Sequence, residues 1–211
     1  GVMQVAVFDT AFHQTMPKRN YIYAVPYNWY TDYGVRRYGF HGTSHKYITE
    51  VMKKKLLKDD VNLIICHVGS GASISCIKDG LCYDTSMGLT PLDGLIMGTR
   101  CGEIDPSIIK YVMHEGEMDV DTIDDILNKK SGLLGICGKS DFRDVVTLCN
   151  EGNSQAKLAY LMYMDASIKH IGEYYFELNG HVDAVVFTAG VLENNAMLRK
   201  DIINEMKDIM N

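Results

Sequence analysis

The sequence predicts an α/β protein with a mixed sheet and helices on both faces. Residues 61–84 read as three short antiparallel strands joined by a Ser-Gly turn and a Lys-Asp-Gly turn. Residues 182–187 (VDAVVF) are a second buried-strand run, followed by a glycine-containing turn and a helix. Amphipathic patterns over residues 119–130 and 155–178 predict helices whose apolar faces can cover such a sheet.

The composition is ordinary for a globular protein and argues against two classes of partner. The 211 residues are 46% hydrophobic and 23% charged, with a formal net charge of −6. This acidic balance argues against binding to nucleic acid or to a membrane surface, and the apolar runs are too short to span a bilayer. The six cysteines form no CxxC pair and no zinc-finger spacing, which favours reduced thiols in a cytoplasmic protein.

The first residues predict a strand that ends in a carboxylate. Val5–Phe8 is a short apolar run, and Asp9 follows it directly. A carboxylate at the end of a buried strand can serve as a metal or phosphate ligand in α/β proteins, although an Asp that caps the next turn is the commoner alternative. Residues 1–8 lack the charged region and cleavage site of a signal peptide. Residues 201–211 stop partway through a helical pattern, so we expect a piece of a longer protein.

The next elements are a tyrosine-rich loop over residues 16–37 and a helix over residues 45–56, for which Thr43 or Ser44 is the expected cap. Further on, Pro106 favours a helix over 107–115.

Two histidines flank the start of that first helix. His41 precedes the cap, where it can donate to an anion at the helix N-terminus. The spacing of His41 and His45 suits zinc only if both lie on one helix, and Gly42 argues against this. A packed, hydrogen-bonded side chain is the alternative for either histidine.

A glycine-rich turn joins the first two strands, with the sequence HVGSGAS over residues 67–73. Backbone N–H groups in such a turn form a concave nest that suits phosphate, and Ser70 and Ser73 add hydroxyl groups. A Ser-Gly hairpin without a ligand explains the same pattern.

Arg100 stands in a second glycine-rich segment, residues 89–105. An arginine there is a candidate to bind a carboxylate or phosphate through two parallel hydrogen bonds. A surface salt bridge to Glu103 is the alternative.

Six motifs occur in one order along the chain: FDTAFHQTMP (8–17), YGFHGTSH (38–45), HVGSGAS (67–73), TPLDGLIMGTR (90–100), SGLLGICGKSDFRD (131–144) and VFTAGVLEN (186–194). Together they resemble the acetate kinase family of the acetate and sugar kinase, Hsp70 and actin superfamily. The resemblance implies an RNase H-like, actin-like ATPase fold with a mixed five-stranded sheet. It also implies that residues 1–45 are an inter-domain, active-site segment and that residues 46–211 are a truncated C-terminal domain for nucleotide binding and dimerisation.

The same resemblance implies roles for individual residues. Asp9 would lie near Mg²⁺ (or Mn²⁺) and the γ-phosphate, while His41 and Arg100 would stabilise the transferring phosphoryl group. Phe40 and Pro91 would line a small pocket for the methyl group of acetate. The residues implied to hold ATP or ADP are His67, Val68, Gly69, Ser70, Gly71, Asp141, Phe142, Arg143, Gly190, Val191, Leu192, Glu193 and Asn194.

Two positions depart from the family pattern on the nucleotide side. Ser70 stands where the family's H-x-G-N-G loop has Asn, and Leu192 stands where its G-I-G-E-N turn has the second Gly. A leucine fills space and does not readily adopt a positive φ. Pyrophosphate or another nucleotide therefore stays open as the phosphoryl donor.

The implied activity is the reversible, in-line transfer of the γ-phosphoryl group of ATP to acetate, in a homodimer, with the fragment alone inactive. Propionate and butyrate kinases are alternatives of the same class. A non-catalytic, actin-like nucleotide-binding module is an alternative of another class, as is a zinc hydrolase that uses His41, His45 and Asp9. The kinase interpretation requires Arg100, His41 and Asp9 to share one cavity.

Overall fold

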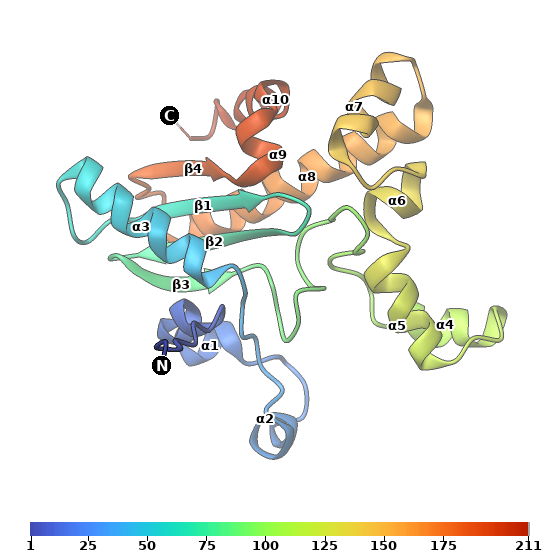
Figure 1. Ribbon diagram of the computed structural model, residues 1–211, viewed down its shortest axis with the longest axis horizontal. Helices are drawn as coiled ribbons and strands as arrows, with labels where there is room; N and C mark the ends of the chain where they lie inside the picture. The colour runs from blue at the N-terminus through green and yellow to red at the C-terminus, as the bar shows by residue number, and fades with distance from the viewer. Residues whose placement is uncertain (211) are drawn as a thin grey trace.

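A four-stranded mixed sheet organises residues 1–210, the residues that this computed structural model describes (Figure 1). The strand order is β3-β2-β1-β4, and β1 runs antiparallel to β2 and parallel to β4. The predicted mixed sheet is confirmed, but the described residues contribute four strands and not five. The strands are β1 (Leu63–Val68), β2 (Ala72–Lys78), β3 (Leu81–Thr85) and β4 (Ala184–Thr188).

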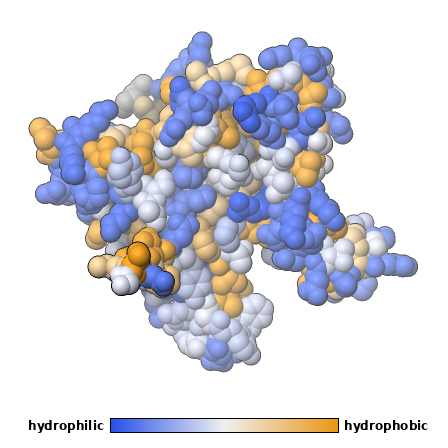
Figure 2. Space-filling model, viewed as in Figure 1, coloured by the Kyte–Doolittle hydropathy of each residue, from blue (hydrophilic) through white to orange (hydrophobic). Residues whose placement is uncertain are grey.

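The strand predicted at Val5–Phe8 is not formed. Residues 1–8 have no regular secondary structure, and the side chains of Val5, Val7 and Phe8 are 74%, 73% and 71% exposed. Hydrophobic side chains gather near the N-terminus in the space-filling view (Figure 2). An apolar run becomes a strand only when a neighbouring strand takes its backbone N–H and C=O groups, and no described strand pairs with this run.

Helices cover both faces of the sheet, as the sequence predicts. Side chains alternate along β1: Ile64 and Cys66 belong to the core that includes helix α8 (Ser154–Glu177). Leu63 and Ile65 belong to the opposite core, which includes Met16 and side chains of helix α3 (Gly42–Leu56). The apolar β1 run is therefore buried on both sides, as expected of a central strand.

The helices predicted over residues 107–115, 119–130 and 155–178 are formed, and further helices lie where none was predicted, among them Ala11–Thr15 and Ala189–Asn194. The expected loop over 16–37 contains two short helices, and the glycine-broken segment at 131–139 contains α6. No helix among the described residues has the length and apolar character needed to cross a membrane. The bounds are η1 (Ala11–Thr15), α1 (Lys18–Tyr21), α2 (Tyr27–Tyr33), α4 (Ser107–Glu115), α5 (Val120–Lys129), α6 (Gly132–Cys137), α7 (Phe142–Asn150), α9 (Ala189–Asn194) and α10 (Ala196–Met206).

Candidate active site

At the start of helix α3, the backbone N–H groups are bound by Asp9 and not by a side chain of the helix itself. The predicted caps, Thr43 and Ser44, are wrong: the N-cap residue is His41, which has a left-handed backbone with φ 58° and makes no side-chain cap. Asp9 Oδ2 accepts a hydrogen bond from the His41 N–H at 2.8 Å, and the Asp9 carbonyl accepts one from the Gly42 N–H at 2.9 Å. A carboxylate is stabilised by the positive end of a helix, so Asp9 is held beside His41.

Two imidazole rings lie face to face at this helix start. The centroids of the His41 and His67 rings are 4.2 Å apart, and Ser44 Oγ lies 2.8 Å from His67 Nδ1. Burial, followed by the neighbouring His67, lowers the pKa of His41 to about 4, and burial lowers the pKa of His67. Both rings are therefore neutral at pH 7, and each has one N–H to donate.

Arg100 reaches the same place from the glycine-rich loop that precedes α4. Its Nη1 donates to the Pro91 carbonyl at 2.8 Å, which fixes the direction of the guanidinium. A Cβ added to Gly71 would lie 2.8 Å from Arg100 Nη2 and 3.3 Å from His41 Nε2. Two nitrogen atoms from segments far apart in the sequence thus point at one spot over Gly71, and Asp9 is joined to it through the His41 backbone.

We expect the Gly71→Ala substitution to lower kcat of the full-length protein by about 10–100-fold, since misplacement of reacting groups by about 1 Å has effects of this size. The new methyl group would displace the Arg100 guanidinium, whose flexible end can move, so the unfolding free energy should change little. Steady-state kinetics and chemical denaturation measure the two quantities. Gly172→Ala on α8 is the control, because Gly172 does not line the cavity and its added Cβ has no neighbour within 4 Å. Equal kcat values for the two variants would contradict the convergence at Gly71.

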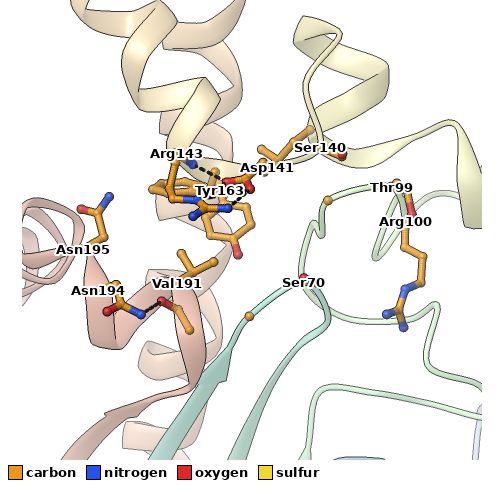
Figure 3. A pocket seen from close by; sticks show the side chains of 15 residues that line it. Ser70, Thr99, Arg100, Ser140, Asp141, Arg143, Tyr163, Val191, Asn194 and Asn195 are labelled. Atoms are coloured by element: carbon orange, nitrogen blue, oxygen red, sulfur yellow. Dashed lines mark hydrogen bonds and ion pairs between the residues drawn. The ribbon is translucent and has the colours of Figure 1, made fainter.

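A cavity of about 930 Å³ opens on the other side of the hairpin tip (Figure 3). Asp141, Arg143 and Tyr163 lie on one side of it, Asn194 and Asn195 on another, and the tip that carries Ser70 stands between them and Arg100. Arg143 Nη2 pairs with Asp141 Oδ2 at 2.6 Å, and this contact lowers the pKa of Asp141 to about 2. Of the residues predicted to hold nucleotide, those that line the cavity are Gly69, Ser70, Asp141, Phe142, Arg143, Gly190, Val191 and Asn194.

The other residues of that prediction do not line this cavity. His67 faces His41, and Gly71 faces Arg100. Val68 and Leu192 are fully buried in the core. Glu193 Oε1 accepts hydrogen bonds from Thr188 Oγ1 and the Ala189 N–H, so this carboxylate shapes the turn between β4 and α9.

The position of Leu192 contradicts the expectation that this side chain fills space on the nucleotide side. Its side chain does not fill space on the nucleotide side, because it points into the core with 0% exposure. The residue with a left-handed backbone in this turn is Ala189, with φ 66°. Leucine therefore occurs in α9 without the backbone strain that the motif comparison suggested.

Six residues line the cavity that sequence reasoning did not assign to it. Four of them lie inside the sequence motifs, and Asn195 directly follows another motif. Proximity to a motif could therefore have indicated these five residues. Tyr163 belongs to the amphipathic helix predicted over 155–178; it is 1% exposed and still reaches the cavity wall. The six are Gly98, Thr99, Leu133, Ser140, Tyr163 and Asn195.

The residues predicted for the acyl pocket are attached to this site. Phe40 directly precedes His41, and its carbonyl accepts a hydrogen bond from His13 Nε2 at 2.9 Å. The Pro91 carbonyl accepts the bond from Arg100. Both residues are thus fixed next to the groups that converge at Gly71.

The zinc alternative is not favoured. His41 Nδ1 and His45 Nε2 each lie 2.8 Å from Ser73 Oγ, so these ring nitrogens already have a partner. Within residues 1–210, the group of three side chains spaced to hold a metal ion is Asp84, Glu173 and Glu177.

These three carboxyl groups belong to β3 and α8, and none of them lies within the six sequence motifs. Their ligand oxygens fall within 4.8 Å of one another. Burial, followed by the nearby Asp84, raises the pKa of Glu177 to about 7. Burial also raises the pKa of Asp84 to about 6, although the Arg37 guanidinium opposes this. Asp84 and Glu177 therefore behave as a coupled pair that retains a proton near neutral pH.

This pair predicts a pH-dependent stability. The pKa of a glutamate is about 4.3 in an unfolded chain and about 7 for Glu177 in the fold. The protonated carboxyl is favoured in the fold, so its contribution is complete below pH 4 and is lost as the pH rises through 7. Glu177→Gln should remove this loss and raise the unfolding free energy at pH 8 by about 1 kcal/mol, a value reduced for partial exposure.

Chemical denaturation between pH 6 and pH 8 measures this difference. The exposed Glu205→Gln on α10 is the control. Parallel stability curves for wild type and Glu177→Gln would contradict the proton-sharing pair.

Comparison with known proteins places the whole described chain in one group. The sequence profile of the Acetokinase family matches residues 1–210. The chain is 50% identical over 210 residues to a protein named acetate kinase from Finegoldia magna, with coverage of 99% of this chain and 53% of that protein. The chain spans about half the length of the curated relatives it matches.

Two solved structures are closely similar to the fold. A propionate kinase from Francisella tularensis superposes with a TM-score of 0.93 at 49% identity, over 96% of this chain and 53% of that one. The acetate kinase of Porphyromonas gingivalis superposes with a TM-score of 0.92 at 43% identity, over 96% of this chain and 51% of that one. The expected actin-like ATPase fold is thereby confirmed.

Proposed function

The chain belongs to the acetokinase family, and from this premise we propose that the full-length protein is an acetate kinase. It transfers the γ-phosphoryl group of ATP to acetate and yields ADP and acetyl phosphate, reversibly. The observation that carries the proposal is the convergence of Arg100 Nη2 and His41 Nε2 over Gly71, beside the 930 Å³ cavity.

The reaction needs positioning and charge neutralisation more than it needs a base. A simple carboxylic acid has a pKa of about 4, so acetate is already an anion at pH 7. The difficulty is to bring this anion to a more strongly charged phosphate. Arg100 supplies a fixed positive fork, and His41 supplies a neutral N–H donor to the transferring phosphoryl group.

The shape of the cavity supports a nucleotide as donor. Its volume lies in the range of pockets for small organic ligands, and Phe142, Tyr163 and Val191 add apolar and aromatic surface to it. Such surface suits an adenine ring and is unnecessary for pyrophosphate. Ser70 at the hairpin tip, with Gly69, is placed to meet the phosphates, and Leu192 leaves the cavity free.

The chemistry of Asp9 fits Mg²⁺. The ion prefers carboxylate, phosphate and water oxygens and commonly takes only one or two ligands from the protein. Asp9 is exposed, and its Oδ2 is fixed by the His41 N–H, so Asp9 would hold the ion directly or through water. When bound, the ion offsets negative charge on the ATP phosphates.

Trapping of the acyl phosphate as a hydroxamate tests the proposal. We expect acetate with ATP to give the highest kcat/KM, propionate to be about 10–200-fold poorer because one methylene changes the discrimination by about 1–3 kcal/mol, and pyrophosphate to give no product. Higher kcat/KM for propionate would favour the activity named for the Francisella tularensis protein. Nucleotide binding without acyl phosphate would favour the non-catalytic module.

We also propose that the protein is a cytoplasmic homodimer. All six cysteines are free, which suits a reducing compartment. Apolar side chains that are exposed on α8, such as Leu158, Leu161 and Phe176, supply surface for a second copy. Light scattering of the full-length protein should give twice the mass of one chain, and a monomer would contradict the proposal.

A further inference from the structure

We propose that Ser73 is a positioning residue that keeps the proton of His41 on Nε2, through a directional chain of hydrogen bonds from His45 to Ser73 to His41. Nothing in the transfer mechanism above uses Ser73 or His45. The consequence for phosphoryl transfer rests on the proposed function, whereas the tautomer of His41 is a property of the folded protein alone.

The side chains of His41, His45 and Ser73 form one hydrogen-bonded group next to the spot over Gly71. Ser73 lies on β2 opposite His67 of β1, and it is 0% exposed. Its Oγ lies 2.8 Å from His41 Nδ1 and 2.8 Å from His45 Nε2. His41 and His45 are four residues apart at the start of α3, so both rings project from the same side of the helix.

The direction of the chain follows from counting hydrogens. A serine hydroxyl has one hydrogen to donate, and a neutral imidazole has one N–H and one bare nitrogen. If both rings donated to Ser73, its hydroxyl hydrogen would be left buried without an acceptor. One ring must therefore donate to Ser73 and the other must accept from it.

His45 decides which ring donates. Its Nδ1 is fully enclosed and has no hydrogen-bond partner among the described residues. A proton on Nδ1 would be a buried N–H without an acceptor, which native proteins rarely contain. The proton of His45 therefore lies on Nε2 and points to Ser73 Oγ, and the Ser73 hydroxyl donates to His41 Nδ1.

The remaining proton of His41 then lies on Nε2, the atom that faces the spot shared with Arg100 Nη2. Burial lowers the pKa of His45 well below its usual value, so the His45 ring in this series of hydrogen bonds is neutral at physiological pH. An oxyanion at that spot would receive N–H groups from both His41 and Arg100. The other tautomer would present a bare nitrogen lone pair to the anion and repel it.

His13 holds the residue before His41 through a hydrogen bond to a backbone carbonyl, and this bond determines the tautomer of His13. Its Nε2 lies 2.9 Å from the Phe40 carbonyl, which only accepts, so the proton must be on Nε2. Its Nδ1 then accepts from the Cys82 thiol at 3.1 Å. Burial raises the pKa of Cys82 and keeps this thiol protonated. The residue before His41 is thus held by a directional contact as well.

Long-range ¹H–¹⁵N NMR of the full-length protein with ¹⁵N-labelled histidine tests the proposal. We expect His41 in wild type to have a protonated Nε2 and a bare Nδ1, and Ser73→Ala to have a mixture of both tautomers. The matched control is Ser75→Ala: Ser75 lies on the same strand, is also 0% exposed and bonds Thr85 Oγ1 at 2.8 Å. His41 should be unchanged in that variant.

Kinetics provide the second measurement. Ser73→Ala should lower kcat at least 10-fold with KM for ATP and for acetate within about two-fold, Ser73→Thr should restore most of the loss, and Ser75→Ala should resemble wild type. A proton on His41 Nδ1 in wild type would overturn the proposal, even if Ser73→Ala failed to fold. An Nε2 proton in wild type that gives way to a mixture of tautomers in Ser73→Ala, without acetate kinase activity, would uphold the proposal and contradict the proposed function; an Nε2 proton that Ser73→Ala leaves unchanged would overturn the role of Ser73.

Discussion

Arg100→Ala should lower kcat of the full-length protein by about three orders of magnitude, with only a modest change in the KM for ATP. Removal of one preorganised donor to a developing oxyanion costs about 10²–10³ in rate, and loss of an arginine that neutralises a transferring phosphoryl group costs about 10³–10⁵. Arg100 lies at the edge of the 930 Å³ cavity with its guanidinium turned toward His41 and Gly71, so most of its effect should fall on the chemical step. Steady-state kinetics with acetate and ATP measure both constants.

Two variants calibrate this result. Arg100→Lys keeps the charge but loses the planar fork, so its kcat should fall between those of wild type and Arg100→Ala. His41→Ala should lose only about 10–100-fold, because a neutral donor contributes less than a fixed charge. A kcat for Arg100→Ala near that of wild type, or a larger loss for His41→Ala, would overturn the roles assigned to these residues.

Gly42→Ala should have the second largest effect, on stability and activity together. A methyl group at this position would overlap the carbonyl oxygen of Asp9, a backbone atom that cannot swing aside. Overpacking of this kind costs about 1–3 kcal/mol of unfolding free energy. Displacement of Asp9 from the start of α3 should also lower kcat by about 100-fold, since the carboxylate and His41 are positioned together.

Gly172→Ala is the matched control, because Gly172 also lies inside a helix and an added Cβ there has no neighbour within 4 Å. It should be neutral or more stable by up to about 1 kcal/mol, since alanine favours helix over glycine. Chemical denaturation and kinetics on both variants test the comparison. Equal stabilities would show that the Asp9 segment moves freely and does not anchor the site.

The elements predicted best from the sequence are those whose ends or turns are determined by neighbouring residues in the chain. The helix over Ser107–Glu115 has the predicted bounds, because Pro106 and the glycine after Glu115 mark its ends. The hairpin of β1 and β2 was readable from apolar runs around a glycine turn. The run at Val5–Phe8 was wrongly assigned, because a strand requires a partner and no local pattern reveals one.

Site features that depend on distant segments were harder to predict. Arg100 and His41 both reach Gly71, and Asp9 binds the His41 N–H, but of these three residues only Arg100 lines the cavity. The predicted start of α3 was wrong, because a carboxylate from another part of the chain binds its first N–H groups. The raised pKa of Glu177 was also missed, since it depends on the approach of α8 to β3. Leu192 was placed in the nucleotide site by motif position, whereas its orientation in α9 buries it in the core.

The most direct test of the account is a crystal structure of the full-length protein with ADP, acetate and a metal-fluoride mimic of the transferring phosphoryl group. We expect one ligand atom of the mimic to accept hydrogen bonds from both Arg100 Nη2 and His41 Nε2, directly over Gly71. A mimic that binds elsewhere, or that contacts neither nitrogen, would contradict the shared anion site.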